Sequence, residues 1–401
     1  MKSCIEMNRP LHAQKYSLSY YFASIVIFVF FAVPSDYYFE RISVPHLVSF
    51  IPIQYLHIAI SVLALIALIS NCTLQRFQLD SISLLLFIRV LASVFISLSS
   101  SRGIESIGAI AVPLGSLLAY LIGLNSRISS CRQLLVPLGF FCIVVSLQLI
   151  LTVGSIDQSR FVFENEIVQW IKIPLASSNA IAGYLLPAIL FVAFALDASK
   201  AVKGIVLLAG FIALRLTTSS FVWVALIASL IIIAAVYNDK NKARNMFLLV
   251  TAFCVICAVV FIAVPLLDMQ ELSHGRINIW SETLSEGLKR PLLGHGVGYF
   301  DHEQTHNILI DLFYQNGVVG LVVYLSAVIK VLKTCAIDSS LKPSFAYLVA
   351  LFLYQCEETC YFDYRGDILF WAFAGFAMAL AMHNRSEIAN LLNTQKESDV
   401  R

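Results

Sequence analysis

Long apolar runs dominate this sequence and restrict what it can fold into. Each reaches or approaches the length of about 17 to 25 residues with which a helix crosses a bilayer. Lipid offers the backbone no hydrogen-bond partner, so such runs must form helices that satisfy their own peptide groups. The chain is 59% hydrophobic and only 13% charged, so we predict an all-α polytopic membrane protein. Twelve spans are expected, near residues 18–34, 49–70, 81–99, 104–123, 133–153, 178–196, 203–216, 218–237, 245–267, 308–332, 344–360 and 367–383.

The distribution of basic residues predicts how these spans are oriented. With both termini in the cytoplasm, 17 of the 27 Lys and Arg residues fall inside and eight outside, while Arg89 and Arg215 stay at membrane depth. This bias agrees with the positive-inside rule. The seventh run is short and almost fused to the eighth through Thr217 and Thr218, so eleven spans is the competing count.

One integral-membrane domain, residues 1–401, is therefore expected, with no separate soluble domain. Residues 154–177 and 268–306 form the two longest loops and face outward, and residues 384–401 form a cytoplasmic tail. A site built from the outer loops would act outside the cytoplasm, where ATP and nucleotide sugars are absent. Any transfer reaction there needs an activated substrate carried by the membrane.

The second outer loop and the span after it hold most of the reactive side chains. Residues 277–289 alternate apolar and polar positions at helical spacing, which predicts an amphipathic helix at the membrane interface; a loop that merely rests on the membrane is an equal alternative. Arg276 begins this helix at the depth of lipid phosphates. Four of the eight histidines lie in or just before the segment: His274, His295, His302 and His306.

His306 and Asn307 open the tenth span, with Asp311 one turn below on the same face. An imidazole titrates near neutrality, and Asp301, Glu303 or Asp311 could fix its tautomer and raise its basicity, so His306 is a candidate general base. A histidine with a purely structural role is the alternative. The histidine spacing matches no familiar zinc motif, and we predict no metal and no cofactor. Gly317 and Gly320 are expected to allow close helix packing.

Charged groups at membrane depth need a partner. For Arg89 we expect a buried ion pair with an acidic residue of another helix. Arg215 lies near the outer end of its span, from which it could reach an anion at headgroup depth. Acidic residues near the last two spans, namely Glu357, Glu358, Asp363 and Asp367, could either bind sugar hydroxyls or form a solvated rim.

The order and spacing of these residues resemble a known family signature. Its parts are Arg276 with Trp280, then Pro291-Leu-Leu-Gly294-x-Gly296-x-Gly298-x-Phe300, then His306-Asn307-x9-Gly317-x-x-Gly320. Together they resemble the O-antigen ligase and polymerase superfamily over about residues 178–325. An upstream run that includes Asn179 resembles the segment that opens a middle span in that superfamily.

The resemblance implies a metal-independent glycosyltransferase with a C-type helical fold in the bacterial cytoplasmic membrane. It implies an undecaprenyl-diphosphate-linked glycan as donor and a glycan or lipid acceptor. Carried over by position, His306 is the base on the acceptor hydroxyl and Arg276 holds the donor diphosphate, with Asn307, Asp311 and Asn179 in support. The superfamily often has Ser-Arg where this chain has Ser219-Ser220, and Arg215 is the candidate substitute.

A repeat-unit polymerase for O-antigen or exopolysaccharide is the predicted function, because the run from Lys172 to Asn179 resembles exopolysaccharide polymerases more than ligases. An O-antigen ligase, which transfers the glycan to lipid A-core, is the alternative. A secondary transporter is a third reading, although no internal repeat supports it. Membrane lipids and other polysaccharide-assembly proteins are the expected partners, and nucleic acid is not.

Overall fold

The computed structural model describes residues 78–99, 110–126, parts of 130–150, 178–195, 199–237 apart from 218 and 220, 276–297, 305–356 and 365–399. Every regular element in these ranges is a helix. The helices are α3 (Ser81–Leu98), α4 (Ala111–Leu124), α7 (Ser178–Phe194), α8 (Lys200–Leu216), α9 (Phe221–Tyr237), α11 (Arg276–Gly287), α12 (Ile308–Ile337), η6 (Ser339–Leu341), α13 (Lys342–Gln355) and α14 (Arg365–Asp399).

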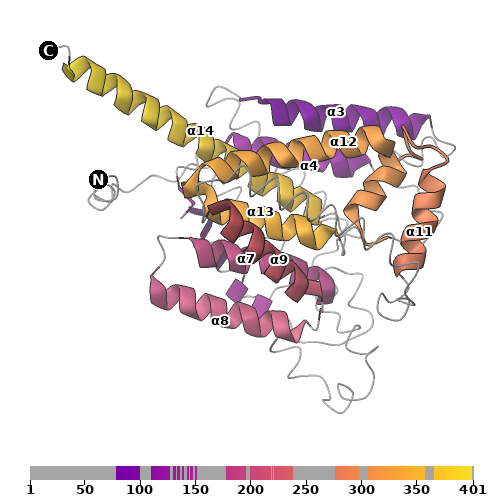
Figure 1. Ribbon diagram of the computed structural model, residues 1–401, viewed down its shortest axis with the longest axis horizontal. Coiled ribbons are helices and arrows are strands. Elements are labelled where there is room, and N and C mark those ends of the chain that lie inside the picture. Colours follow the sequence, from indigo (N-terminus) through magenta and orange to yellow (C-terminus); the bar gives the residue numbers. More distant parts are fainter. Residues whose placement is uncertain are drawn as a thin grey trace.

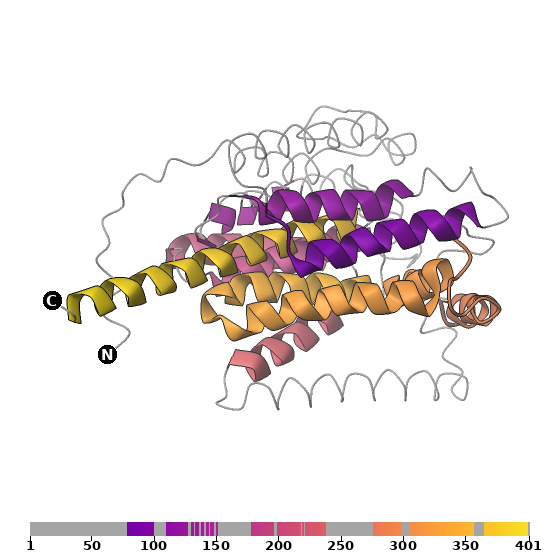
Figure 2. The same ribbon diagram turned by 90° about the horizontal axis from the view of Figure 1, so that it is seen from above.

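Most of these helices run side by side along one axis and form a bundle, whereas α11 lies across one end of it (Figures 1 and 2). Three described stretches are long and apolar enough to cross a membrane: Ser81–Leu98, Ile308–Ile337 and Gly366–Ile388. Shorter apolar helices span Val112–Leu124, Ile181–Phe194 and Phe221–Tyr237. The predicted spans at 18–34, 49–70 and 245–267 lie outside the described residues, so the count of twelve stays a prediction.

The first helix that the structure describes, α3, begins where its sequence indicates. Asp80 is the N-cap of α3, and its side chain accepts hydrogen bonds from the backbone N–H groups of Ile82 and Ser83. Ser83 returns the interaction, because its hydroxyl oxygen accepts from the Asp80 N–H at 2.7 Å, which completes a capping box. The second carboxylate oxygen of Asp80 accepts from the Tyr120 hydroxyl at 2.6 Å. The cap of α3 is thus also a contact with α4.

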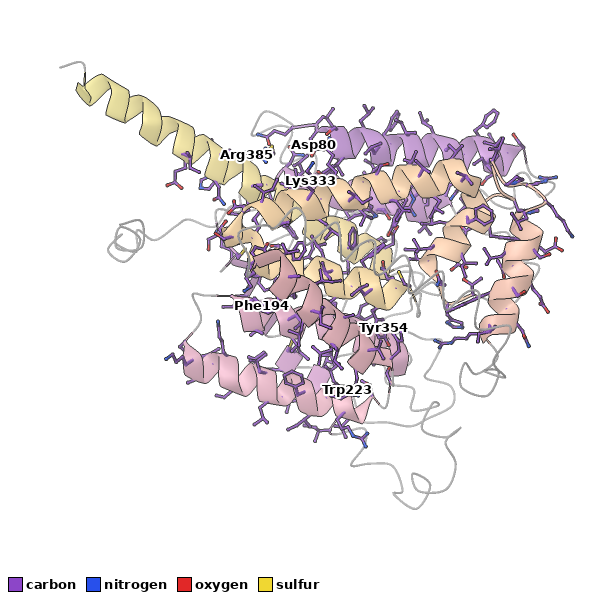
Figure 3. All side chains as sticks on the ribbon, in the orientation of Figure 1. Asp80, Phe194, Trp223, Lys333, Tyr354 and Arg385 are labelled. Carbon is purple, nitrogen blue, oxygen red and sulfur yellow. The ribbon has the colours of Figure 1, made fainter. Side chains whose placement is uncertain are left out.

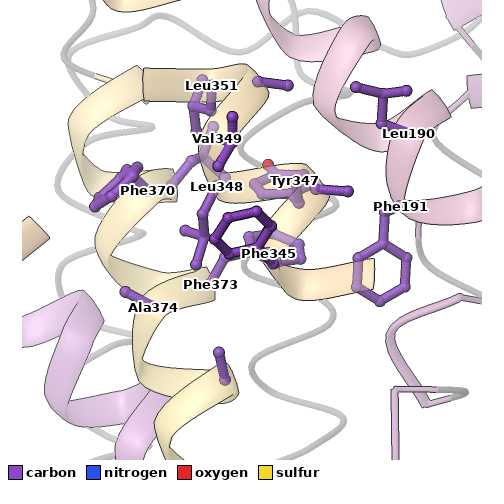
Figure 4. Packing of buried hydrophobic residues seen from close by; sticks show 14 of the residues in the cluster. Leu190, Phe191, Phe345, Tyr347, Leu348, Val349, Leu351, Phe370, Phe373 and Ala374 are labelled. Atoms are coloured by element: carbon purple, nitrogen blue, oxygen red, sulfur yellow. The ribbon is translucent and has the colours of Figure 1, made fainter. Parts of the chain in front are cut away.

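The centre of the bundle is an aromatic and aliphatic core that joins α7, α13 and α14 (Figure 4). Tyr347 and Phe373 stack with ring centroids 3.8 Å apart, and Phe191 meets both rings edge-on. All three side chains are buried. The edge-to-face contacts of Phe191 add to the free energy of burying the rings.

α14 crosses α4 at a point where both helices carry glycine. A Cβ atom on Gly123 would lie 2.4 Å from the Ala372 carbonyl oxygen, and one on Gly375 would lie 2.3 Å from the Tyr120 carbonyl oxygen. Only hydrogen fits there on either side. Small residues let membrane helices approach this closely and gain van der Waals contact, which replaces the hydrophobic drive that lipid does not supply.

The predicted burial of Arg89 in an ion pair is confirmed, and the partner is Asp367 of α14. Their N and O atoms lie 2.9 Å apart. The carboxylate also accepts hydrogen bonds from three neutral donors: Ser116 at 2.6 Å, Trp371 at 3.0 Å and Tyr324 at 3.3 Å. Neither interpretation proposed for Asp367, sugar binding or a solvated rim, holds, because its carboxylate is buried and shared by α3, α4 and α12. Glu357, Glu358 and Asp363 lie outside the described residues.

Contacts distant in sequence define the two ends of the bundle. At one end, Lys330 of α12 bonds Ser81 at the start of α3, and Asn384 of α14 bonds Asp338 at 2.9 Å. Figure 3 shows Asp80, Lys333 and Arg385 gathered at this end, from which α14 projects. At the other end lie α11, the last turn of α3 and the first turn of α12 (Figure 1). Residues 384–399, predicted as a tail, continue α14 as helix.

Candidate functional site

The predicted amphipathic helix is present as α11, and Arg276 is its first residue. It crosses the end of the bundle instead of joining it (Figures 1 and 2). Thr283 and Gly287 are buried on the face toward α12, and Ser281, Glu282 and Ser285 are exposed. A helix in this position can lie along a membrane surface while its inner face closes the end of the bundle.

The glycine-rich loop after α11 is inserted into a break in α12. At Gly317 the backbone has φ 63° and ψ −166°, so the helix that was predicted to be continuous over 308–332 is interrupted there. A break in a helix leaves peptide groups without their helical partners, and each such group costs several kcal/mol where no water reaches it. Four of these groups are paired with the loop instead. The carbonyls of Tyr314 and Gln315 accept from His295 and Gly296 at 2.9 Å each, and the N–H groups of Val318 and Val319 donate to Pro291 and Leu292 at 2.8 and 3.3 Å.

This pairing gives the glycines of the motif their physical role. A Cβ atom on Gly317 would lie 2.3 Å from the Leu292 backbone, and one on Gly294 would lie 2.5 Å from that of Gln315. Both residues also have positive φ, which an L side chain rarely adopts. Gly317 does allow close packing, as predicted, but against a loop and not against a helix.

His295 lies in the contact between this loop and α12. Its ring stacks on Tyr314 with centroids 4.7 Å apart, and its Nε2 lies 3.0 Å from the Glu286 carbonyl oxygen. The loop is also fixed to α3, because the Val297 N–H donates to the Ser97 hydroxyl oxygen at 3.2 Å. These contacts account for His295 by packing and hydrogen bonding.

His306 lies in a tight turn directly before α12. It is the only non-glycine residue of the described chain with positive φ, at 55°, and it is half-buried. The hydroxyl oxygen of Thr305 accepts a hydrogen bond from the Asn307 N–H at 3.1 Å and so bridges across His306. The same hydroxyl donates to Asp311 Oδ1. Asn307 then caps α12, accepting from Leu309 at 3.0 Å and Ile310 at 3.2 Å through Oδ1.

A hydrogen bond from Trp280 joins α11 to this turn. The indole Nε1 of Trp280 donates to the carbonyl oxygen of Thr305 at 2.5 Å. Arg276 lies four residues before Trp280 in α11, which places both on one face of the helix, one turn apart. The helix face that carries Arg276 therefore meets the turn that carries His306.

The other predicted residues are distributed as follows. Asn307 and Asp311 belong to the His306 turn: Asn307 is the N-cap of α12, and its carbonyl oxygen accepts from the Asp311 N–H at 2.9 Å, one turn on. Arg215 is exposed in the last turn of α8, which packs on α7 at the edge of the bundle opposite α3 (Figure 1). No hydrogen bond or ion pair of the described residues joins Arg215 to α11 or α12. Asn179 lies in the first turn of α7, and the structure does not describe its side chain.

The sequence did not predict two groups that hold the His306 turn, namely the hydroxyl of Thr305 and the indole N–H of Trp280. A threonine two residues before a possible N-cap is a known local signal, because its hydroxyl oxygen can accept the N–H two positions on. Nothing local marks the Trp280 contact, since its partner lies 25 residues away. Within the described ranges, no group of three His, Cys, Asp or Glu side chains could hold a metal ion. His274, Asp301, His302 and Glu303 lie outside them.

Apolar helices of the described chain form a bundle, and three of them are long enough to cross a membrane. With the polar candidate site at one end of this bundle, they define a multi-pass membrane protein. Residues 205–325 match the family model described as O-antigen ligase. The match includes α11, the inserted loop and the first half of α12, and it confirms the predicted resemblance to the O-antigen ligase and polymerase superfamily. This family points to a membrane glycosyltransferase-like activity on lipid-linked glycans. No curated protein shows significant similarity to the chain.

Proposed function

We propose that this protein is a polysaccharide repeat-unit polymerase that transfers a glycan from undecaprenyl diphosphate to the sugar of a lipid-linked acceptor. The contact between Trp280 and Thr305 carries the proposal, because it joins the helix of Arg276 to the turn of His306. A cation and an imidazole are thereby held at the same end of the bundle. That pairing suits a reaction in which one group receives a proton and the other faces a growing negative charge.

In the proposed reaction, His306 accepts the proton of the acceptor hydroxyl. The hydroxyl oxygen attacks the anomeric carbon of the donor sugar and forms the new glycosidic bond. The bond from that carbon to the diphosphate oxygen breaks, and its electron pair stays on the diphosphate. Arg276, at the headgroup-facing start of α11, binds the diphosphate oxygens as charge builds up. Lipid diphosphate is a good leaving group, so the scheme requires no nucleotide.

We place the site on the outer face of the cytoplasmic membrane, with both termini inside. The end of the bundle opposite α11 carries Lys333 of α12 and Arg385 of α14 (Figure 3), and Lys330 bonds Ser81 at the same end. Basic residues are retained on the cytoplasmic side. This arrangement supports an outward-facing α11.

The test is glycan electrophoresis from a deletion strain that carries wild-type protein, His306→Ala or His383→Ala. His383 lies on α14 beyond the core, so the same substitution there is the matched control. We expect long glycan chains from wild type and His383→Ala, and single repeat units from His306→Ala at equal protein level in the membrane. Near-normal chains from His306→Ala would contradict the role of the base.

The same gel separates a polymerase from a ligase. Loss of a polymerase leaves one repeat unit on the final acceptor. Loss of a ligase leaves long chains on undecaprenyl diphosphate and none on lipid A-core. The second result would assign the site to ligation, with the same donor chemistry and another acceptor.

A further inference from the structure

The backbone at His306 is held in a conformation that an isolated peptide rarely adopts. With φ at 55°, the residue lies in the left-handed region, where its Cβ crowds the carbonyl oxygen that follows. Residues persist in such conformations only where the surrounding structure determines them. At His306 one such contact lies within the turn and another comes from α11.

Thr305 supplies the determinant within the turn. It is fully buried, and its hydroxyl is both an acceptor, from the Asn307 N–H at 3.1 Å, and a donor, to the buried carboxylate of Asp311. The hydroxyl therefore connects the residues on either side of His306 to the first turn of α12. Removing it would release the restraint while leaving the imidazole in place.

Trp280 supplies the determinant from outside the turn. Its indole N–H donates to the Thr305 carbonyl oxygen, which belongs to the peptide unit that enters His306. The contact fixes the orientation of that peptide plane relative to α11. Its loss would leave the Thr305 hydroxyl bonds intact but would release the turn from the helix that carries Arg276.

We propose that Thr305 and Trp280 are positioning residues for His306, which set the direction of its imidazole by fixing the peptide units before and after it. The proposal rests on the proposed function, in which His306 is the base. A base must lie within hydrogen-bond reach of the hydroxyl from which it takes a proton. Because the Cα–Cβ direction of His306 follows from its φ, a relaxed turn would aim the ring elsewhere. Thr305 and Trp280 touch neither reactant in this scheme.

The first measurement is the rate of chain elongation in membrane vesicles supplied with the strain's own lipid-linked glycan. Thr305→Val has the same shape without the hydroxyl, and Thr305→Ser restores the hydroxyl without the methyl group. A displaced catalytic group costs on the order of 100-fold in rate. We expect kcat to fall on that order in Thr305→Val with little change in KM, and to stay near wild type in Thr305→Ser. Trp280→Phe, which keeps a ring and loses the N–H, should also lower kcat.

The second measurement does not depend on activity. Diethyl pyrocarbonate acylates unprotonated imidazole, and mass spectrometry of the peptides gives a separate rate for each histidine. In Thr305→Val the modification rate of His306 and its pH dependence should change, while His383, at the far end of the bundle, should react as in wild type. Thr305→Ser should give the wild-type profile at both histidines.

Each of the following results either supports or overturns the proposal. A slow Thr305→Val, a normal Thr305→Ser and an altered His306 profile would support the proposal. Wild-type kcat and an unchanged His306 profile in Thr305→Val would overturn it, as would a folded Thr305→Ser with the same loss as Thr305→Val. If Thr305→Val fails to insert in the membrane, a fully active Trp280→Phe with an unchanged His306 profile would overturn it. If His306→Ala is active while Thr305→Val changes the modification profile of His306, His306 is not the base, but Thr305 still positions its imidazole.

Discussion

The ion pair between Arg89 and Asp367 joins two helices inside the bundle, and its loss should destabilise the protein. The two residues are 6% and 8% exposed and belong to α3 and α14. Asp367 accepts hydrogen bonds from Arg89 and three neutral donors, and the Arg89 guanidinium also lies 4.9 Å from the Tyr324 ring centroid. Removing one partner of such a pair leaves a buried charge and costs about 3–5 kcal/mol.

The two single substitutions should not be equally costly. Arg89→Met leaves a carboxylate, which can take up a proton and become neutral. Asp367→Asn leaves a guanidinium, which stays charged at every accessible pH. We therefore expect Asp367→Asn to lose about 3–5 kcal/mol of unfolding free energy and Arg89→Met to lose less. The double variant has no stranded charge, so it should be more stable than Asp367→Asn.

The assay is unfolding of each variant in mixed micelles by titration with a denaturing detergent, which completes a double-mutant cycle. We expect the loss in the double variant to be smaller than the sum of the single losses by about 2 kcal/mol. Additive losses would refute the reasoning, because they would show that neither charge depends on the other. A double variant less stable than both singles would refute it as well.

Two further outcomes follow from the local geometry. Gly317→Ala places a Cβ atom 2.3 Å from the Leu292 backbone at φ 63°. We expect this substitution to lower the unfolding free energy by at least about 2 kcal/mol. Gly204→Ala is the control that should not be destabilised, because nothing lies within 4 Å of the added atom. Asp338 caps η6, and although burial opposes its ionisation, hydrogen bonds from Asn384 and Ser340 prevail and lower its pKa below the ordinary value of 3.8. Its stabilisation of about 1 kcal/mol should be complete above pH 3.8 and disappear as the pH falls through the lower folded value. Thermal midpoints of wild type and Asp338→Ala should then converge in acid, and a gap that persists there would count against this reading.

The sequence predicted the parts of the site that depend on local pattern. Helical spacing of apolar residues over 277–288 predicted α11, and Arg276 indeed begins it. An arginine in an apolar run required a buried counter-charge, and Arg89 has one. The sequence could not identify Asp367 as the partner of Arg89, because Asp367 lies 278 residues away and is selected by how α3, α4 and α14 pack.

The interruption of α12 shows why the remainder was not predictable. Residues 308–332 are apolar enough to form one continuous span, although Asn316-Gly317 within it is a local turn signal. The break at Gly317 is stable only because the loop from Pro291 to Gly296 supplies backbone partners for the freed groups. No pattern within α12 encodes the presence of that loop.

The sequence by itself determined that this chain is helical and membrane-embedded, since lipid leaves the backbone no alternative, and it located the candidate reactive residues in one segment. Only the tertiary structure decided which of them meet. The Thr305 hydroxyl accepts from the Asn307 N–H across His306, and the Trp280 indole donates to the Thr305 carbonyl oxygen 25 residues further along the chain, whereas Arg215 lies on another edge of the bundle. Directional hydrogen bonds between distant residues exist only after the helices have packed, so their geometry is a property of the fold.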